Sequence, residues 1–156
     1  MKIYTVDFES IIKVYKPYID AAMELENEKN GHISRIEGYK KEMQDIINSS
    51  QTIILDEKLK KEKMEKFGKL QNEASKIDNE FRIRISKMQD EMMKKIYTQI
   101  EEIISDFSVK SSIDMVINKT EVIYSSAQVD LTSTIIDLVK DKGLYTDELL
   151  NKKESV

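Results

Sequence analysis

Apolar side chains recur every three or four residues through the middle of the chain, which is the spacing of one face of an α-helix. Twelve of them follow one another between Phe67 and Phe107, in 11 steps that cover 40 residues, or about 3.6 residues per step. A stripe with this period stays in line along a straight helix. The pattern therefore predicts one long helix that begins near residues 53–56 and ends near Phe107.

A second helical pattern precedes it, from Pro17 to about Asn48, and Gly31 and Gly38 are the positions where we expect any bend. The polar run NSSQT at residues 48–52 separates the two patterns. Side chains of this kind compete for backbone hydrogen bonds and cap helices. Together the patterns predict an antiparallel helical hairpin, an arm, over residues 17–107 with its tip near residues 48–56.

The two ends of the chain carry short runs of alternating, β-branched residues, which is the pattern of strands. KIYTVDF at the N-terminus predicts a strand at residues 2–7. Beyond the helices, IDMVIN and EVIYSS predict two more strands at residues 113–118 and 121–126, joined as a hairpin by a turn at residues 118–120.

Shorter helical signals complete the chain. A helical turn is expected in SIIKVY, just before Pro17. Asp130 is placed to cap a helix of about residues 131–141, and Gly143 stands just past its end, where glycine commonly terminates helices. Residues 144–156 form a polar tail.

The elements give an α+β fold that is mostly α. Three short strands that are apolar on both faces need cover on both faces, and one terminal helix cannot supply it. We therefore expect several copies to join their strands into one small closed body made of residues 1–16 and 108–143. Its predicted contact residues are Ile3, Val6, Met115, Val116, Ile117, Val122, Ile123 and Tyr124.

Composition limits the possible functions. The 156 residues favour one domain, and the absence of cysteine excludes disulfides and thiolate metal sites. A formal net charge of −4 makes binding to nucleic acid or to an anionic membrane surface unexpected. No apolar run approaches the roughly 20 residues of a membrane span, so no stable membrane insertion is expected. The start MKIYTVDFES has no apolar leader segment, so the chain is cytoplasmic if Met1 is its native start and exported if a leader was removed.

Candidate catalytic chemistry is sparse. His32 is the only histidine, and we interpret it as a residue of a helix face. The acidic pairs at residues 90–91 and 101–102 are neighbours in a helix, so their carboxylates point apart. No phosphate-binding loop, metal-spaced cluster or nucleophile motif is present. We expect no catalytic residue, no metal site, no cofactor and no enzymatic activity.

Apolar residues near the expected tip are instead candidates for binding other proteins. The run TIIL at residues 52–55 is either an exposed apolar lip or ordinary packing, and methionine adapts to varied partners. The Lys-rich stretch at residues 58–66 is interpreted as a solvated face. The predicted binding residues are Met43, Ile47, Ile53, Ile54, Leu55, Met64 and Met93.

The order strand, long helix, long helix, two strands, short helix resembles the Skp/OmpH family of outer-membrane-protein chaperones. The start KIYTVDFESII and the stretch IDMVINKTEVIYSSAQVDLTSTII look like the two terminal signatures of that family. The resemblance implies a jellyfish-like homotrimer in which strands of three subunits form the body and three helical arms enclose a cavity. It also implies a periplasmic holdase that shields unfolded outer-membrane proteins without ATP.

Two features depart from this family. Its members are often basic whereas this chain is acidic, although residues 56–69 carry six lysines against four acids. The family's leader is the second missing feature. A different function also fits the same layout, namely a trimeric coiled-coil scaffold or adaptor that binds one partner through the arm tips.

Overall fold

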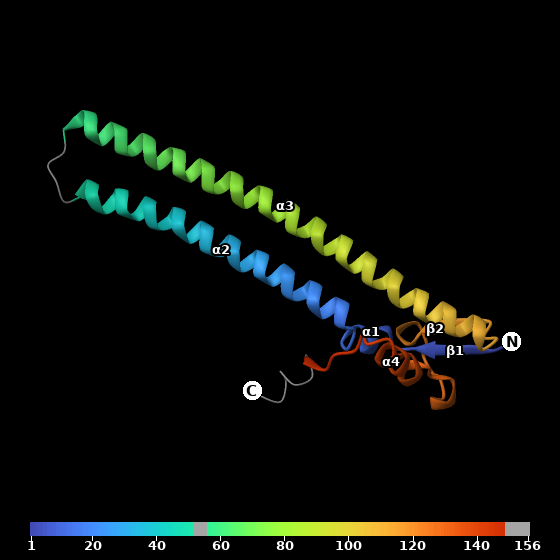
Figure 1. Cartoon of the computed structure of the whole chain (residues 1–156). Helices are drawn as coiled ribbons and strands as arrows, with labels where there is room; N and C mark the ends of the chain where they lie inside the picture. Colours follow the sequence, from blue (N-terminus) through green and yellow to red (C-terminus); the bar gives the residue numbers. More distant parts are fainter. Residues whose placement is uncertain (52–55, 149–156) are drawn as a thin grey trace. The chain divides into compact units, whose positions relative to one another are not determined.

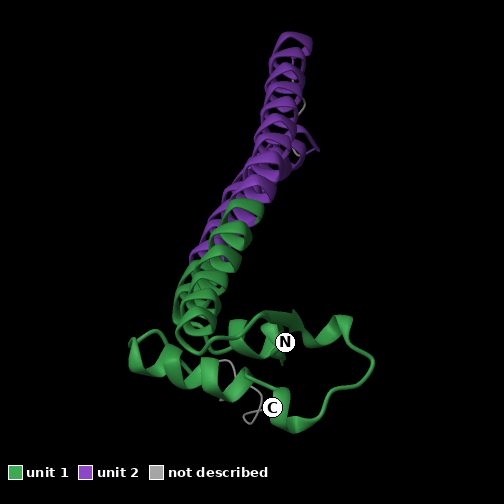
Figure 2. Ribbon diagram, turned by 90° about the vertical axis from the view of Figure 1, so that its right-hand side faces the viewer, with its two compact units in different colours: residues 1–23, 90–156 green, residues 24–89 purple. Residues whose placement is uncertain are grey.

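The computed structural model describes residues 1–51 and 56–148 (Figure 1). Two compact units can be distinguished (Figure 2). The first unit combines residues 1–23 with the described residues from Asp90 onwards, and the second comprises residues 24–89 without the undescribed 52–55. Two long helices, α2 (Lys16–Gln51) and α3 (Glu57–Lys110), contribute to both units.

The predicted helices are confirmed to within three residues at the ends that the structure describes. Helix α2 runs through both Gly31 and Gly38 without interruption, and it continues through the serines of the polar run as far as Gln51. Helix α3 ends where Ser112 adopts a positive φ of 51°. The N–H groups of Ser112 and Ile113 donate to the carbonyls of Val109 and Ser108, at 3.3 and 2.9 Å, which satisfies the last turn of the helix.

The sheet has two strands rather than the predicted three. β1 (Ile3–Val6) and β2 (Met115–Asn118) pair in parallel, with Ile3 opposite Met115 and Val6 opposite Asn118. Parallel strands require a crossover connection, and here the crossover consists of α1 (Phe8–Ile12), α2 and α3.

The predicted strand at residues 121–126, and with it the hairpin, is wrong for a single chain. A 3₁₀ turn at Lys119–Glu121 follows β2 directly, and a second one spans Ala127–Val129. No residue at 121–126 pairs with a strand of the described chain, and Asp130, beyond them, forms an isolated bridge with Thr5 of β1. Strand propensity expresses how well side chains suit a pleated surface, and it becomes a strand only where another strand offers its edge.

The terminal helix α4 (Thr132–Asp141) begins one residue later than predicted. Leu131 occupies the N-cap position instead of Asp130, although the Asp130 carboxylate accepts a hydrogen bond from the Thr132 N–H at 2.9 Å. The expected glycine end is confirmed. Gly143 has a φ of 69°, and the N–H groups of Gly143 and Leu144 donate to the carbonyls of Lys140 and Val139, both at 2.9 Å.

A hydrophobic core occupies the first unit, where α1, the C-terminal part of α3 and α4 meet. Its fully buried side chains are Ile11, Ile100, Ile135 and Val139. Tyr15 is buried beside them, and its hydroxyl donates to Oε1 of Gln99 at 3.1 Å. Both ends of the chain therefore contribute to one core.

The second unit is an antiparallel helix pair, as predicted. Four polar contacts cross between its helices, and the two residue numbers of each contact add to 110 or 112. They join Glu28 with Arg84, His32 with Asp78, Tyr39 with Glu73, and Ser49 with Lys63. Leu25 is the only buried apolar side chain of this unit among the described residues. The register is thus marked by polar contacts along a seam of half-buried side chains.

Candidate functional site

Two surfaces of the described chain could bind other molecules: the outer edge of β2 with the loop that follows it, and the second unit. The β2 edge is considered first. β2 hydrogen-bonds to β1 on one side, and the described chain places no strand on its other side. An unpaired strand edge offers backbone N–H and C=O groups to another chain.

The side chains around this edge are largely exposed. Ile3 and Met115 are exposed, Val116, Ile117 and Val122 are half-buried, and Ile123 is fully exposed. Tyr124 is 83% exposed. Val6 is the exception among the predicted contact residues, because it is buried in the core of the subunit. A hollow of about 350 Å³ adjoins the edge and is lined mainly by α3 and β2, with Ile104, Ile113 and Val116 as apolar walls.

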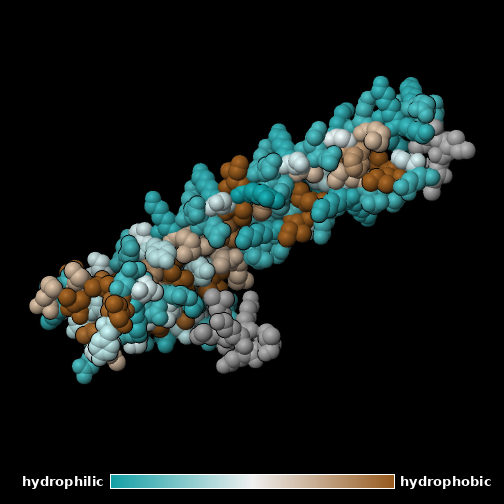
Figure 3. Space-filling model, turned by 180° about the vertical axis from the view of Figure 1, so that it is seen from behind, coloured by the Kyte–Doolittle hydropathy of each residue, from teal (hydrophilic) through white to brown (hydrophobic). Residues whose placement is uncertain are grey.

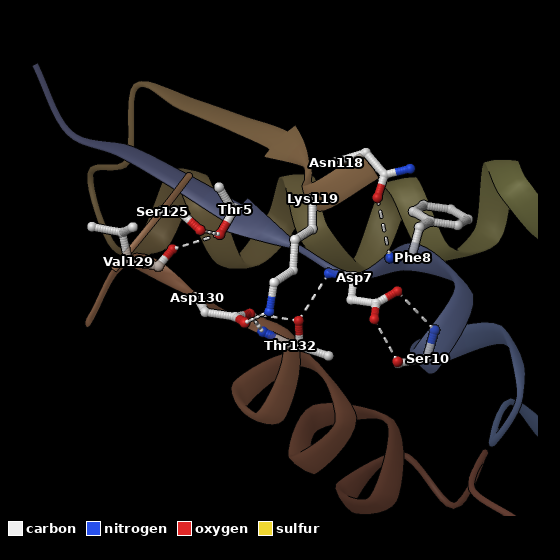
Figure 4. A network of polar contacts seen from close by, with 10 residues as sticks. All are labelled: Thr5, Asp7, Phe8, Ser10, Asn118, Lys119, Ser125, Val129, Asp130 and Thr132. Atoms are coloured by element: carbon white, nitrogen blue, oxygen red, sulfur yellow. Dashed lines mark hydrogen bonds and ion pairs between the residues drawn. The ribbon is translucent and has the colours of Figure 1, made fainter. Parts of the chain in front are cut away.

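A polar network holds the loop that follows β2, which we call the 119–130 loop (Figure 4). Lys119 Nζ lies 2.8 Å from Oδ2 of Asp130, so an ion pair joins the two ends of the loop. Oδ1 of Asp130 accepts hydrogen bonds from the N–H and the hydroxyl of Thr132 at the start of α4. The Thr132 hydroxyl oxygen in turn accepts from the backbone N–H of Asp7, at 2.8 Å.

The same network fixes the end of β1. Asp7 caps α1 by accepting hydrogen bonds from the N–H and hydroxyl of Ser10, at 3.1 and 2.7 Å. The Phe8 N–H donates to Oδ1 of Asn118, the last residue of β2, at 3.4 Å. Thr5 is a buried polar residue of β1, and its hydroxyl lies 3.4 Å from the Ser125 hydroxyl and from the Val129 carbonyl oxygen. The 119–130 loop is therefore anchored to β1 and to α4.

The charges of the network are mutually supportive. The hydrogen bonds from Lys119 and then Thr132 lower the pKa of the Asp130 carboxyl to about 2. The Asp130 carboxylate in return raises the pKa of Lys119 above its usual 10.5. Hydrogen bonds from Ser10 lower the pKa of Asp7, and the nearby Lys119 ammonium contributes to the same shift. The Lys119 ammonium thus stabilises the charged forms of two carboxylates, those of Asp130 and Asp7. The sequence analysis did not predict this role.

The predicted binding residues of the arm do not form one cluster. Met64 is 67% exposed and Ile47 is 39% exposed, whereas Met43 is half-buried. All three belong to the second unit, and Figure 3 shows apolar side chains there as isolated groups among hydrophilic ones. Met93 packs against the core of the first unit instead. The prediction for Ile53, Ile54 and Leu55 lies outside the described residues.

His32 has a more specific environment than a helix face alone suggests. Its ring stacks on Phe81 with centroids 3.9 Å apart, and its Nε2 lies 2.9 Å from Oδ1 of Asp78. The hydrogen bonds from His32 and then Arg82 lower the pKa of Asp78. The Arg84 guanidinium lies over the Phe81 ring, with its Cζ 5.5 Å from the ring centroid. It also forms an ion pair with the Glu28 carboxylate at 3.1 Å. These residues link α2 to α3, and the His32 ring is held between Phe81 and the Asp78 carboxylate.

Two kinds of site are not found among the described residues. No group of three or more acidic or histidine side chains in this part of the chain is arranged to hold a metal ion. No helix that the structure describes is long and apolar enough to cross a membrane.

Comparison with known proteins adds a family and a fold. A family model described as "Outer membrane protein (OmpH-like)" matches residues 2–139. The structure is similar to the crystal structure of a Caulobacter crescentus CB15 protein described as a candidate outer membrane chaperone (OmpH-like), with a TM-score of 0.79. The two sequences are 6% identical, and the match covers 90% of this chain and 85% of that one. No curated protein sequence matches the chain.

Proposed function

The chain belongs to the OmpH-like family of outer membrane proteins, and from this premise we propose that it is an ATP-independent holdase chaperone for unfolded outer-membrane proteins. The observation that carries the proposal is the second unit, a long antiparallel helix pair in which Leu25 is the only buried apolar side chain among the described residues. Such a pair can adapt to a client without disrupting a core. By the same premise the protein works in the periplasm, and fractionation of cells that express the native gene tests this location.

Clients bind along the second unit through many weak contacts. Exposed Ile47 and Met64 offer apolar contacts between charged positions, and Met64 is flexible enough to fit varied side chains. Several such contacts in parallel give a stable complex although each one exchanges quickly. Ile53, Ile54 and Leu55 extend this set as a proposal from the sequence alone.

The distribution of charge also supports client binding by the second unit. Residues 24–89 carry 14 lysines and arginines against 13 acids, so the rest of the chain carries the excess negative charge, with 11 bases against 16 acids. The second unit therefore does not repel acidic clients as a whole, and its lysines at residues 56–69 give a local positive bias.

The subunits assemble as a homotrimer through the first unit. The unpaired edge of β2 and the exposed side chains of Ile123 and Tyr124 are the surfaces that support this proposal. Residues 121–126 have the pattern of a strand, and no strand among the described residues of the subunit pairs with them. A neighbouring subunit supplies that partner, so that strands of three copies close into a barrel-like body and three helix pairs surround a cavity.

Aggregation of a denatured β-barrel protein, followed by light scattering, tests the function. Equimolar trimer is expected to suppress aggregation without ATP, and failure to do so in a correctly assembled sample would contradict the proposal. The double variant Ile47→Ser, Met64→Ser is expected to need several-fold more protein for the same suppression. Met23→Ser is the matched control, because this methionine is also exposed on α2 but belongs to the first unit.

A further inference from the structure

The 119–130 loop combines exposed apolar side chains with an ion pair at its two ends. Ile123 and Tyr124 lie near its middle and, apart from Met1, are the most exposed large apolar side chains among the described residues of the first unit. At its ends, Lys119 Nζ and Asp130 Oδ2 are 2.8 Å apart (Figure 4). The loop has only two short 3₁₀ turns of its own.

We propose that Lys119 and Asp130 are positioning residues for self-association, because their ion pair holds the 119–130 loop in the conformation that presents Ile123 and Tyr124 to a second copy of this chain. The inference rests on the proposed assembly through the first unit. It adds a specific role for two residues that lie beside the contact surface rather than within it.

Other contacts also hold the loop: an isolated bridge joins Asp130 to Thr5, and the Leu131 N–H just past the loop donates to the Thr5 carbonyl at 2.8 Å. The hydroxyl of Thr5 reaches Ser125 and Val129, but both distances are 3.4 Å, at the long limit for a hydrogen bond. The ion pair is much shorter, and its charges strengthen the hydrogen bond that it contains. Without Lys119, the loop loses the ion pair that joins its two ends, and it samples more conformations.

The ion pair also connects the loop to rigid parts of the subunit. Asp130 accepts a hydrogen bond from the first N–H of α4, and the core residues Ile135 and Val139 fix that helix. Lys119 directly follows the last residue of β2. The loop is thus fixed to the sheet at one end and to α4 at the other. Fixing both ends holds its middle in a defined position.

The effect on association depends on whether the loop is ordered before the subunits bind or only during binding. A loop that is already ordered in the free subunit loses little conformational freedom on binding, whereas a loose loop must be ordered during association. A partly exposed ion pair changes an equilibrium by about two- to fivefold. Three such pairs in a trimer therefore change the association constant by roughly ten- to a hundredfold.

The experiment compares Lys119→Met with wild-type protein by sedimentation equilibrium over a dilution series. We expect the association constant to fall by roughly ten- to a hundredfold, and the unfolding temperature of the monomer to fall only slightly, because the partly exposed ion pair contributes little to the stability of the subunit itself. Lys119→Arg should restore association, because it restores the charge. Lys142→Met is the matched control, since Lys142 is exposed in the same unit and its hydrogen bond to the Leu138 carbonyl is donated by its backbone N–H.

The outcomes separate this inference from the proposed assembly. Equal association constants for wild type and Lys119→Met would overturn the positioning role and leave the assembly intact. Ile123→Ser removes an exposed side chain without touching the core, and unchanged association of this variant would show that the loop is not the contact. A wild-type protein that stays monomeric at every concentration would overturn the assembly itself.

Discussion

The first and second units of this protein differ in what holds them together, although the same apolar spacing runs along α3 through both. Of the 15 buried apolar side chains in the described chain, 14 belong to the first unit and only Leu25 to the second. A period of about 3.6 residues therefore predicts a helix face, but how deeply that face is buried depends on how many elements surround it. In the first unit α1, α3 and α4 surround one core, whereas in the second unit two helices share a seam.

This difference has a consequence for stability. Regions with few buried apolar contacts open locally at a lower free energy than the core of the same protein. Polar contacts such as His32 with Asp78 mark the register of the second unit but stay partly exposed to water, so each contributes little. A region of this kind suits the holdase role that we propose, because a holdase must change shape to fit its clients.

Truncation of one core side chain should give the largest contrast between the units. Ile100 is fully buried, so Ile100→Ala should destabilise the protein by about 2–5 kcal/mol. Ile77→Ala removes the same atoms from the half-buried seam of the second unit and should cost about 1 kcal/mol or less. Urea unfolding followed by circular dichroism measures both. Equal losses would mean that the seam is as well packed as the core.

Amide hydrogen exchange should sharpen the contrast without any mutation. If the second unit opens at a free energy about 3 kcal/mol lower than the core, its amides exchange about 100-fold faster. The comparison is between α3 residues 70–85 and α3 residues 96–104, which belong to the same helix. Uniform protection along α3 would show that the whole helix opens as one unit.

Two glycines should respond to alanine with opposite signs. Gly38 is helical and has no atom within 4 Å of the position that a Cβ would take, so Gly38→Ala should stabilise α2 by about 0.5–1 kcal/mol. Gly143 has a φ of 69°, so Gly143→Ala should destabilise the end of α4 by about 1 kcal/mol. Thermal unfolding measures both changes. A loss of stability in Gly38→Ala would indicate that α2 is bent or frayed at this position.

Acid should release the 119–130 loop through one carboxylate, which is the smallest effect considered. Because the pKa of Asp130 is lowered to about 2, its contribution to stability is complete above its usual 3.8 and is lost as the pH falls through about 2. The chemical shift of the Thr132 amide proton, which Asp130 accepts, should follow that titration.

Asp130→Asn is the control for this titration, and it should abolish the pH dependence of the Thr132 amide. A wild-type midpoint near 4 would mean that Lys119 does not pair with Asp130 in solution.

Local patterns predicted the helices well because their hydrogen bonds join residues four apart, so the signal lies within one stretch of sequence. They failed at residues 121–126, because whether Val122 and Ile123 form a strand depends on an edge supplied from elsewhere. The pairing of β1 with β2 is equally non-local. Lys119 was missed for the same reason, since its partner Asp130 comes near only when the loop folds back.

The contact of His32 with Asp78 could have been predicted from the sequence if the position of the hairpin tip had been known more exactly. Both residues are equally distant from the tip of the hairpin to within two positions, so a tip near residue 55 would have placed them opposite each other. The predicted tip was a range of nine residues, which is too wide to select a partner. Register, rather than residue type, was the missing information.

The parallel pairing of β1 with β2 fixes the order in which the molecule can be completed during synthesis. Residues 7–114 separate the two strands, and at about 5–20 residues per second the ribosome needs roughly 5–20 s to make them. During that time β1 has no β2 to pair with, whereas α2 and α3 can already pack against each other because they are consecutive in the sequence. β1 thus emerges before the long helices but pairs only after β2 has been made.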